Sequence, residues 1–65
     1  MKNFGIRLKR LREDRGLTLE ELGEIVECNY LMLRDWENGQ RVLTVGKLIK
    51  LAQYFEVSVD YLVGL

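Results

Sequence analysis

Few side chains in this 65-residue chain could carry out catalytic chemistry. It has no histidine and a single cysteine, Cys28, so an internal disulfide and a zinc site built from cysteine or histidine are both excluded. No glycine-rich phosphate loop is present, and the carboxylates lie along amphipathic segments where solvation accounts for them. We therefore expect no enzymatic activity, no metal and no cofactor. The remaining basic, polar and aromatic side chains favour a binding function.

The formal net charge is zero, but the charges are unevenly placed along the chain. Residues 1–16 carry six basic and two acidic side chains, whereas residues 17–39 carry one basic and six acidic ones. Residues 40–65 carry three basic and two acidic side chains. Nucleic-acid binding normally depends on basic side chains that contact phosphates, so a net charge of zero is unusual for a DNA-binding protein.

The middle of the chain predicts two short helices, over residues 19–26 and 30–38, joined by a tight turn. Thr18 is a suitable N-cap, and a glutamate three residues later completes a capping box. Asn29 is a suitable N-cap for the second helix, and Gly39 can adopt the left-handed conformation that often ends one. The apolar side chains at helical spacing, which we expect to face the core, are Leu22, Ile25, Val26, Leu33 and Trp36.

Three further helices are expected around this pair, over residues 3–15, 45–55 and 59–63. Their expected core positions are Phe4, Leu8, Leu11, Val45, Leu48, Ala52 and Phe55. Five helices with short connections predict an all-α, compact globule that forms one domain over residues 1–65. No apolar run approaches the roughly 20 residues of a transmembrane helix. The lone cysteine, expected to be a small buried residue at the central turn, fits a reducing, cytoplasmic setting.

Over almost its whole length, the chain resembles the Cro/repressor-type helix-turn-helix domain of phage and bacterial transcription regulators. The matching residues are RLKRLREDRGLT at 7–18, EEL at 20–22, WENG at 36–39 and LAQYFEVSVDYL at 51–62. Their combination is specific, although each motif alone would be weak. The resemblance implies a lambda-repressor-like fold and a sequence-specific DNA-binding regulator of the repressor kind. In that family the third helix lies in the major groove of double-stranded DNA and the second crosses over it.

The resemblance also implies which residues would contact DNA. Base contacts would come from the third helix, through Tyr30, Leu31, Met32, Arg34 and Asp35. Contacts to the DNA backbone would come from helix N-termini and the following loop, through Thr18, Asn29, Asn38, Gln40, Arg41 and Thr44. The family also pairs an arginine of the first helix with the glutamate of the WENG motif. Here these are Arg12 and Glu37, and we interpret the pair as a structural salt bridge.

Four features depart from the family pattern. Leu19 stands where the family has a glutamine that can hydrogen-bond to DNA, and Glu27 stands where the turn normally has glycine. If residue 27 has a positive φ, a non-glycine residue there costs on the order of 1 kcal/mol. The third helix begins with an apolar run at residues 30–32, and Asp35 would repel phosphate, though it can accept a hydrogen bond from cytosine N4. The alternative is that the apolar run binds a protein partner, in an interaction module or in an antitoxin.

The C-terminal end is too apolar for an unpartnered chain end, and Val42 and Leu43 add to this surface. The family commonly dimerises through this end, so that two recognition helices lie one turn of DNA apart. We therefore expect a homodimer whose interface includes Val59, Tyr61, Val63 and Leu65. The alternative is that the apolar end marks a truncation of a longer protein.

Overall fold

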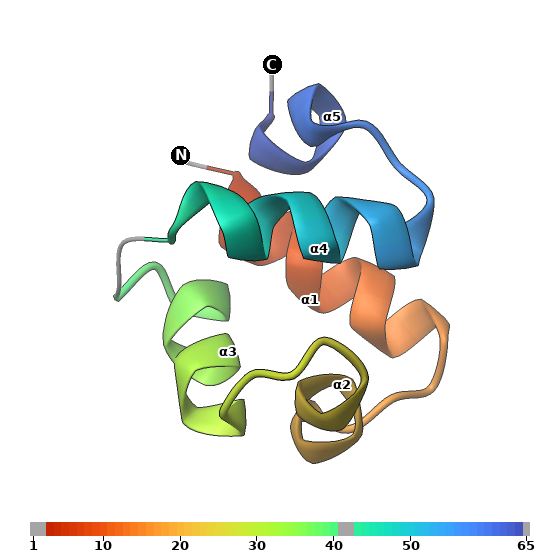
Figure 1. The fold of residues 1–65 in the computed structure, drawn as a ribbon, viewed down its shortest axis with the longest axis vertical. Helices are drawn as coiled ribbons and strands as arrows, with labels where there is room; N and C mark the ends of the chain where they lie inside the picture. The colour runs from red at the N-terminus through yellow and green to blue at the C-terminus, as the bar shows by residue number, and fades with distance from the viewer. Residues whose placement is uncertain (1–2, 41–42, 65) are drawn as a thin grey trace.

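The computed structural model describes residues 3–40 and 43–64, which contain five α-helices and no strand (Figure 1). The helices are α1 (Phe4–Asp14), α2 (Leu19–Ile25), α3 (Tyr30–Glu37), α4 (Val45–Phe55) and α5 (Val59–Val63). Helices α4 and α5 have the predicted bounds, and the other three are slightly shorter than predicted. The predictions for Arg41, Val42 and Leu65 lie outside the described residues. None of the described helices is long and apolar enough to span a membrane.

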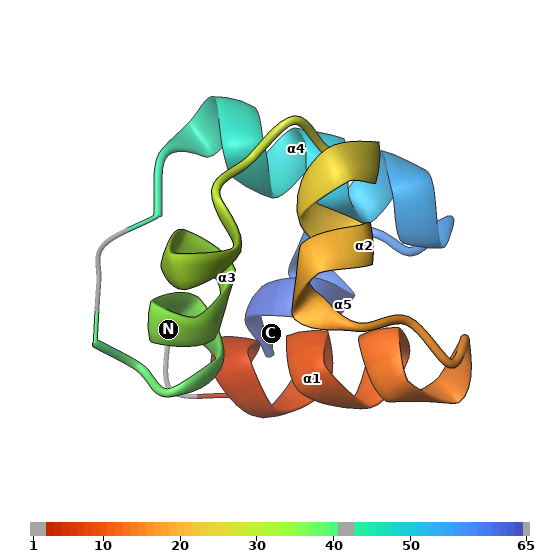
Figure 2. The ribbon, with the colours of Figure 1, turned by 90° about the horizontal axis from the view of Figure 1, so that it is seen from below.

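Helices α1 and α4 run across the molecule, with α2 and α3 on one side of them and α5 on the other (Figures 1 and 2). The core that these helices enclose consists of Phe4, Leu8, Leu22, Val26, Leu33, Trp36, Leu43, Leu51, Ala52, Phe55 and Leu62. Leu11, Leu17, Leu48 and Cys28 pack against this core but are only half-buried. Removing this apolar surface from water is the main favourable contribution to folding.

Side-chain caps begin four of the five helices. Thr18 Oγ1 accepts a hydrogen bond from the Glu21 backbone N–H at 3.0 Å, and the Thr18 N–H donates to Glu21 Oε1 at 2.8 Å. This is the predicted capping box. Asn29, Thr44 and Ser58 cap α3, α4 and α5 with their own side-chain oxygens. These oxygens satisfy N–H groups that the first turn of a helix leaves without partners.

Three predictions about burial are wrong. Ile25 is 42% exposed because Gly23 takes the buried side of α2. A Cβ at Gly23 would lie 2.6 Å from the Cys28 carbonyl oxygen, so the backbone of α2 packs directly against the backbone of the following turn. Because the Gly23 side of α2 faces the protein interior, Ile25 points to solvent. Val45 is 71% exposed because it is the first residue of α4, one turn before the buried side of that helix begins. Leu43, expected to add to an exposed apolar end, is buried in the core.

The C-terminal end of α3 is held by a close approach of α1. A Cβ at Gly5 would lie 2.5 Å from the carbonyl oxygens of both Trp36 and Glu37. The backbone of α1 therefore packs directly against the backbone of the last turn of α3. Figure 2 shows the start of α1 beside the end of α3. The Trp36 side chain is 1% exposed and fills the core at this crossing.

Candidate nucleic-acid interface

Helix α3 buries one side and exposes the other. Leu33 and Trp36 are buried, whereas Tyr30 is 43% exposed and Leu31 is 40% exposed. Arg34 is exposed as well and follows these two residues at spacings of four and three, so the three side chains share one face. The structure thus brings together three of the five residues predicted to contact bases.

The other two predicted base-contacting residues are less accessible. Met32 is half-buried and packs against the core. The Asp35 side chain is 22% exposed, and its Oδ1 accepts a hydrogen bond from Arg34 Nη2 at 3.3 Å. A carboxylate beside Arg34 lowers the positive potential there and so weakens the attraction of this arginine for phosphate.

The residues predicted to contact the DNA backbone, apart from Arg41 outside the described ranges, fall into two groups. Thr18, Asn29 and Thr44 use their side-chain oxygens as helix caps, at distances of 3.0, 2.8 and 3.3 Å from the N–H groups they accept from. Asn38 and Gln40 follow the end of α3 and are exposed, and Gln40 Nε2 donates to the Asn38 carbonyl oxygen at 3.4 Å. The caps present helix N-termini, which attract phosphates, and the second group presents amides.

The ion pair between α1 and the end of α3 is bidentate. Arg12 Nε donates to Glu37 Oε2 at 2.7 Å, and Arg12 Nη2 donates to Glu37 Oε1 at 3.1 Å. Arg12 Nη1 also donates to the Leu17 carbonyl oxygen at 2.8 Å. The two side chains are only 12% and 5% exposed, and the hydrogen bond with Glu37 raises the pKa of Arg12. The pair named by the family resemblance therefore forms, and it fixes the end of α3.

The turn between α2 and α3 contains a residue in the left-handed conformation. Glu27 has a φ of 54°, which disfavours any residue but glycine. Lys47 Nζ donates to the Glu27 carbonyl oxygen at 2.9 Å, and Lys50 Nζ donates to the Glu27 carboxylate. We call these two contacts the Glu27 clamp. They join the turn to α4.

The clamp also affects how Glu27 titrates. The hydrogen bond from Lys50, followed by the positive charges of Lys50 and Lys47, lowers the pKa of Glu27 below its usual value. A carboxyl group whose pKa is lower in the folded state stabilises that state above its unfolded pKa. This contribution is lost as the pH falls through the lower, folded pKa.

The sequence predicts no functional or structural role for Lys47 or Lys50. They lie 20 and 23 residues beyond Glu27, so no local spacing rule connects them to the turn. Two lysines three residues apart on a helix are typical of a solvated face. Only the packing of α4 against the turn reveals the clamp.

Replacing Glu27 with glycine should raise the Tm by about 3–6 °C, because glycine adopts a positive φ without strain. The contact from Lys47 is to a backbone carbonyl and survives the substitution, whereas the exposed ion pair with Lys50 is lost and contributes less than the strain. Thermal unfolding followed by circular dichroism measures the change. Glu27→Ala is the control, since it loses the same ion pair but keeps the strain. A glycine variant that melts no higher than the alanine variant would contradict a strained turn.

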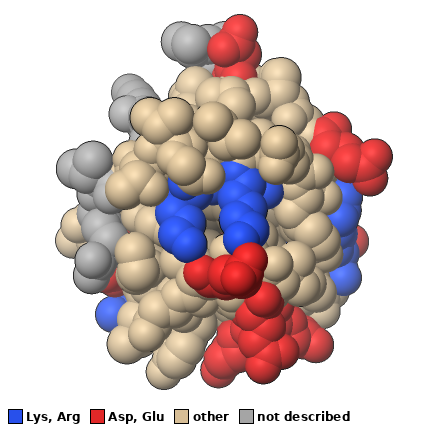
Figure 3. Space-filling view, in the orientation of Figure 1, with Lys and Arg blue, Asp and Glu red and all other residues tan. Residues whose placement is uncertain are grey.

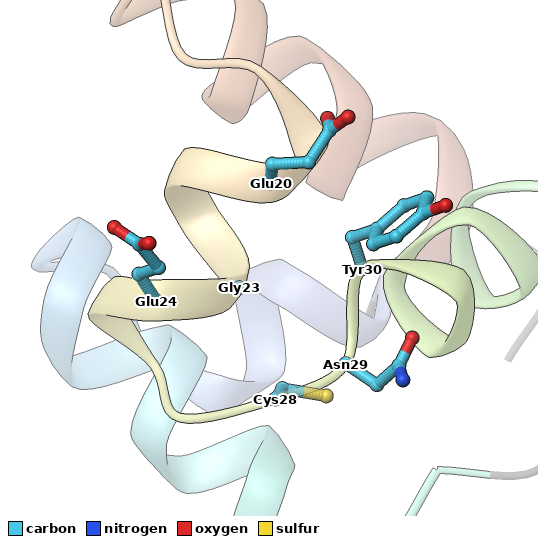
Figure 4. A pocket seen from close by; sticks show the side chains of 6 residues that line it. All are labelled: Glu20, Gly23, Glu24, Cys28, Asn29 and Tyr30. Carbon is cyan, nitrogen blue, oxygen red and sulfur yellow. The ribbon is translucent and has the colours of Figure 1, made fainter.

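An open hollow of about 310 Å³ lies beside the start of α3 (Figure 4). It is lined by Glu20, Gly23, Glu24, Cys28, Asn29 and Tyr30. Figure 4 shows the two glutamates on α2 and the Tyr30 ring at the start of α3. Carboxylates repel phosphate but can accept a hydrogen bond from cytosine N4. The hollow therefore disfavours the DNA backbone and tolerates a base edge.

The charges on the molecular surface form no continuous basic field on the face seen in Figure 3. Basic side chains lie at its centre with acidic groups directly beside them, and further acidic groups gather over α2. Within residues 3–40 and 43–64, no group of three or more metal-ligating side chains is placed to hold an ion. The recognition of DNA by this surface would thus depend on local contacts more than on long-range attraction.

Residues 8–62 match the family model described as helix-turn-helix. The chain belongs to this helix-turn-helix family. This confirms the family resemblance, and the five-helix all-α fold is the one predicted.

Known proteins resemble this chain in sequence and in structure. It is 39% identical to the HTH-type transcriptional regulator PrpR of Mycobacterium tuberculosis, over 88% of this chain and 12% of PrpR. A transcriptional regulator from Listeria innocua superposes with a TM-score of 0.88 at 32% identity, over 95% of this chain and 58% of that one. The restriction-modification controller protein C.AhdI from Aeromonas hydrophila superposes with a TM-score of 0.84 at 30% identity, over 92% of this chain and 91% of that one. The chain spans about half the length, or less, of the curated relatives it matches.

The residues predicted to form a dimer interface in this helix-turn-helix protein are only partly exposed. Val59 and Val63 are half-buried. Tyr61 is 42% exposed, but the Arg7 guanidinium lies over its ring, 4.6 Å from the centroid. Arg7 Nη1 also donates to the Tyr61 carbonyl oxygen at 2.6 Å, which ties α1 to α5. The exposed apolar side chains of α4 are Val45, at 71%, and Ile49, at 43%.

Proposed function

We propose that this chain is the DNA-binding unit of a transcription regulator of the repressor kind, and that it places α3 in the major groove. The face formed by Tyr30, Leu31 and Arg34 carries this proposal. Tyrosine and leucine side chains can contact thymine methyl groups, and an arginine can donate two hydrogen bonds to one guanine. The relatives that match this chain are named as transcriptional regulators, which supports the same function.

The other predicted contacts take supporting roles in this proposal. Asp35 accepts a hydrogen bond from cytosine N4, and the outer part of Met32 borders the base contacts. The DNA backbone is contacted by helix N-termini and amides at Thr18, Asn29, Asn38, Gln40, Arg41 and Thr44. We propose that this function involves no enzymatic activity and that the protein acts in the cytoplasm.

We propose further that the chain binds its operator as a homodimer. Two recognition helices related by a two-fold axis would then fall one turn of DNA apart. The interface includes Val59, Tyr61, Val63 and Leu65, as the sequence predicts. Val45 and Ile49 on α4 are further exposed apolar side chains that a partner could cover.

A second candidate function is supported by the surroundings of Tyr30 and Leu31. Tyr30 lines a hollow that Glu20 and Glu24 also line, and the exposed Leu31 follows Tyr30 on α3. An apolar patch with acidic neighbours suits a basic protein partner better than it suits phosphate. The chain would then be a protein-interaction module or an antitoxin.

Selection from a pool of random DNA duplexes across a salt series separates the two functions. A DNA-binding regulator selects one sequence, and its affinity falls steeply as salt rises because counterions are released. The spacing of the selected half-sites then shows whether the protein binds as a dimer with its recognition helices one turn of DNA apart. No binding even at low salt would exclude the DNA-binding function and favour the protein partner.

Arg34→Ala should weaken binding to the selected operator by roughly tenfold, because the arginine can donate two hydrogen bonds to a guanine edge. Binding to unrelated duplexes should change much less. Fluorescence anisotropy with operator and scrambled duplexes measures both affinities. Arg10→Ala is the matched control, since Arg10 is exposed on α1 and makes no ion pair within the described part of the chain.

Arg41→Ala should behave differently, weakening binding to all duplexes about equally, as loss of a phosphate contact does. If Arg34→Ala and Arg41→Ala both leave the DNA affinities unchanged, the proposed docking of α3 is wrong.

A further inference from the structure

We propose that Glu27 is a positioning residue: through Lys47 and Lys50 it holds the start of α3 in the orientation that distinguishes the operator from other DNA. The inference rests on the proposed DNA-binding function and goes beyond it, because Glu27 is not among the residues proposed to contact DNA. The clamp fixes the position of the turn relative to α4.

The two ends of α3 are held by very different contacts. At the C-terminal end, α3 is held by the close packing of Gly5 against the backbone of Trp36 and Glu37 and by the nearly buried Arg12–Glu37 ion pair. At the N-terminal end, the Cys28 N–H donates to the Gly23 carbonyl oxygen at 2.8 Å, which ties the turn to α2. The Glu27 clamp ties the same turn to α4.

The clamp lies close to the residues that would contact bases. Tyr30 and Leu31 follow Glu27 by three and four residues, and both are on the exposed face of α3. Thr44, three residues before Lys47, caps the helix whose N-terminus would contact phosphate. The clamp therefore links the base-contacting end of α3 to the phosphate-contacting end of α4. Small displacements between two such groups of contacts strongly reduce recognition.

Charge and position predict opposite effects when Glu27 is neutralised. Its side chain is 76% exposed, so its loss removes a repulsive charge and should increase binding to any DNA. If Glu27 positions α3, the same substitution should lower the preference for the operator. The ratio of operator affinity to scrambled-duplex affinity separates the two effects.

The experiment compares the parent protein with Glu27→Gln and with Glu24→Gln. Glu24 is exposed on α2 and has no ion-pair partner in the described ranges, so its substitution makes the same change of charge without touching the clamp. We expect the specificity ratio to fall about three- to tenfold in Glu27→Gln and to stay at the parent value in Glu24→Gln. The exchanged pair Glu27→Lys/Lys50→Glu keeps the net charge and should restore the ratio to within about twofold. Glu27→Gly should combine a higher Tm with a lower ratio, which a purely structural role would not produce.

Amide hydrogen exchange tests the clamp without DNA. The Leu31 and Met32 N–H groups donate to Asn29, and in Glu27→Gln they should exchange about three- to tenfold faster than in the parent, with little change at Trp36. Equal specificity ratios in Glu27→Gln and Glu24→Gln would overturn the inference, as would an exchanged pair that fails to restore the ratio. If the parent shows no sequence preference, the proposed function fails. Independently of DNA binding, equal amide hydrogen exchange rates at Leu31 and Met32 in Glu27→Gln and in the parent would overturn the positioning role.

Discussion

Gly5→Ala should destabilise the protein by about 3 kcal/mol or more, which is a large fraction of the stability of a small domain. The added methyl group would lie 2.5 Å from the carbonyl oxygens of Trp36 and Glu37, and no real Cβ makes such contacts. Both obstacles are backbone atoms, so no side chain can rotate away. Helices α1 and α3 would have to separate, which opens the core around Trp36. Urea unfolding followed by far-UV circular dichroism measures the loss.

Gly46→Ala is the matched control for this substitution. Gly46 lies in the first turn of α4, and nothing lies within 4 Å of the place its Cβ would take. Alanine there should stabilise the protein by about 0.5–1 kcal/mol, because a helical alanine loses less conformational entropy than glycine. The same chemical change should therefore have opposite signs at the two positions. Equal stabilities of the two variants would contradict the close crossing of α1 and α3.

Arg12→Ala and Glu37→Ala should each cost about 2–3 kcal/mol, because each leaves a nearly buried charge without its partner. The double variant should cost clearly less than the sum of the two single variants. We expect a coupling energy of at least about 1.5 kcal/mol from the double-mutant cycle, since the pair is bidentate and only slightly exposed. Urea unfolding of the four proteins gives this value.

The Arg34–Asp35 pair provides a comparison within the same protein. Its distance is 3.3 Å, and the Arg34 side chain is 55% exposed. Solvent and salt screen such a pair, so its coupling energy should stay below about 0.5 kcal/mol. If the two cycles gave similar coupling energies, the Arg12–Glu37 pair would not be the anchor of α3. Weak coupling at Arg34 also means that this side chain can leave Asp35 for a base at little cost.

The balance of charges around α3 affects how the proposed binding to DNA would work. Glu20 and Glu24 flank the start of the helix, and Lys47 and Lys50 are already engaged with Glu27. Among residues 3–40 and 43–64, few other basic groups remain to contact phosphates near the apolar Tyr30–Leu31 face. Non-specific affinity should therefore be low, and discrimination should come from base contacts and their positioning.

Local chemistry made the limits of the helices predictable from sequence. Thr18 and Asn29 cap helices where predicted, because a short polar side chain satisfies the N–H groups of the turn that follows it. Thr44 and Ser58 cap α4 and α5 in the same way. Gly39 has the expected positive φ. The Arg12–Glu37 pair came from the family resemblance and not from spacing, since 25 residues separate the two side chains.

Tertiary packing decided the features that no local rule contains. Periodicity placed Ile25 in the core, but the approach of α2 to its turn needed the bare backbone of Gly23, and Ile25 was displaced to the surface. In the same way, the family resemblance indicated that position 27 normally holds glycine, but it did not indicate that two lysines of α4 contact Glu27. The sequence by itself determined the helices, their caps and the family. Only the tertiary structure decided which side of each helix is buried and which distant charges meet, because both depend on how close the backbones approach.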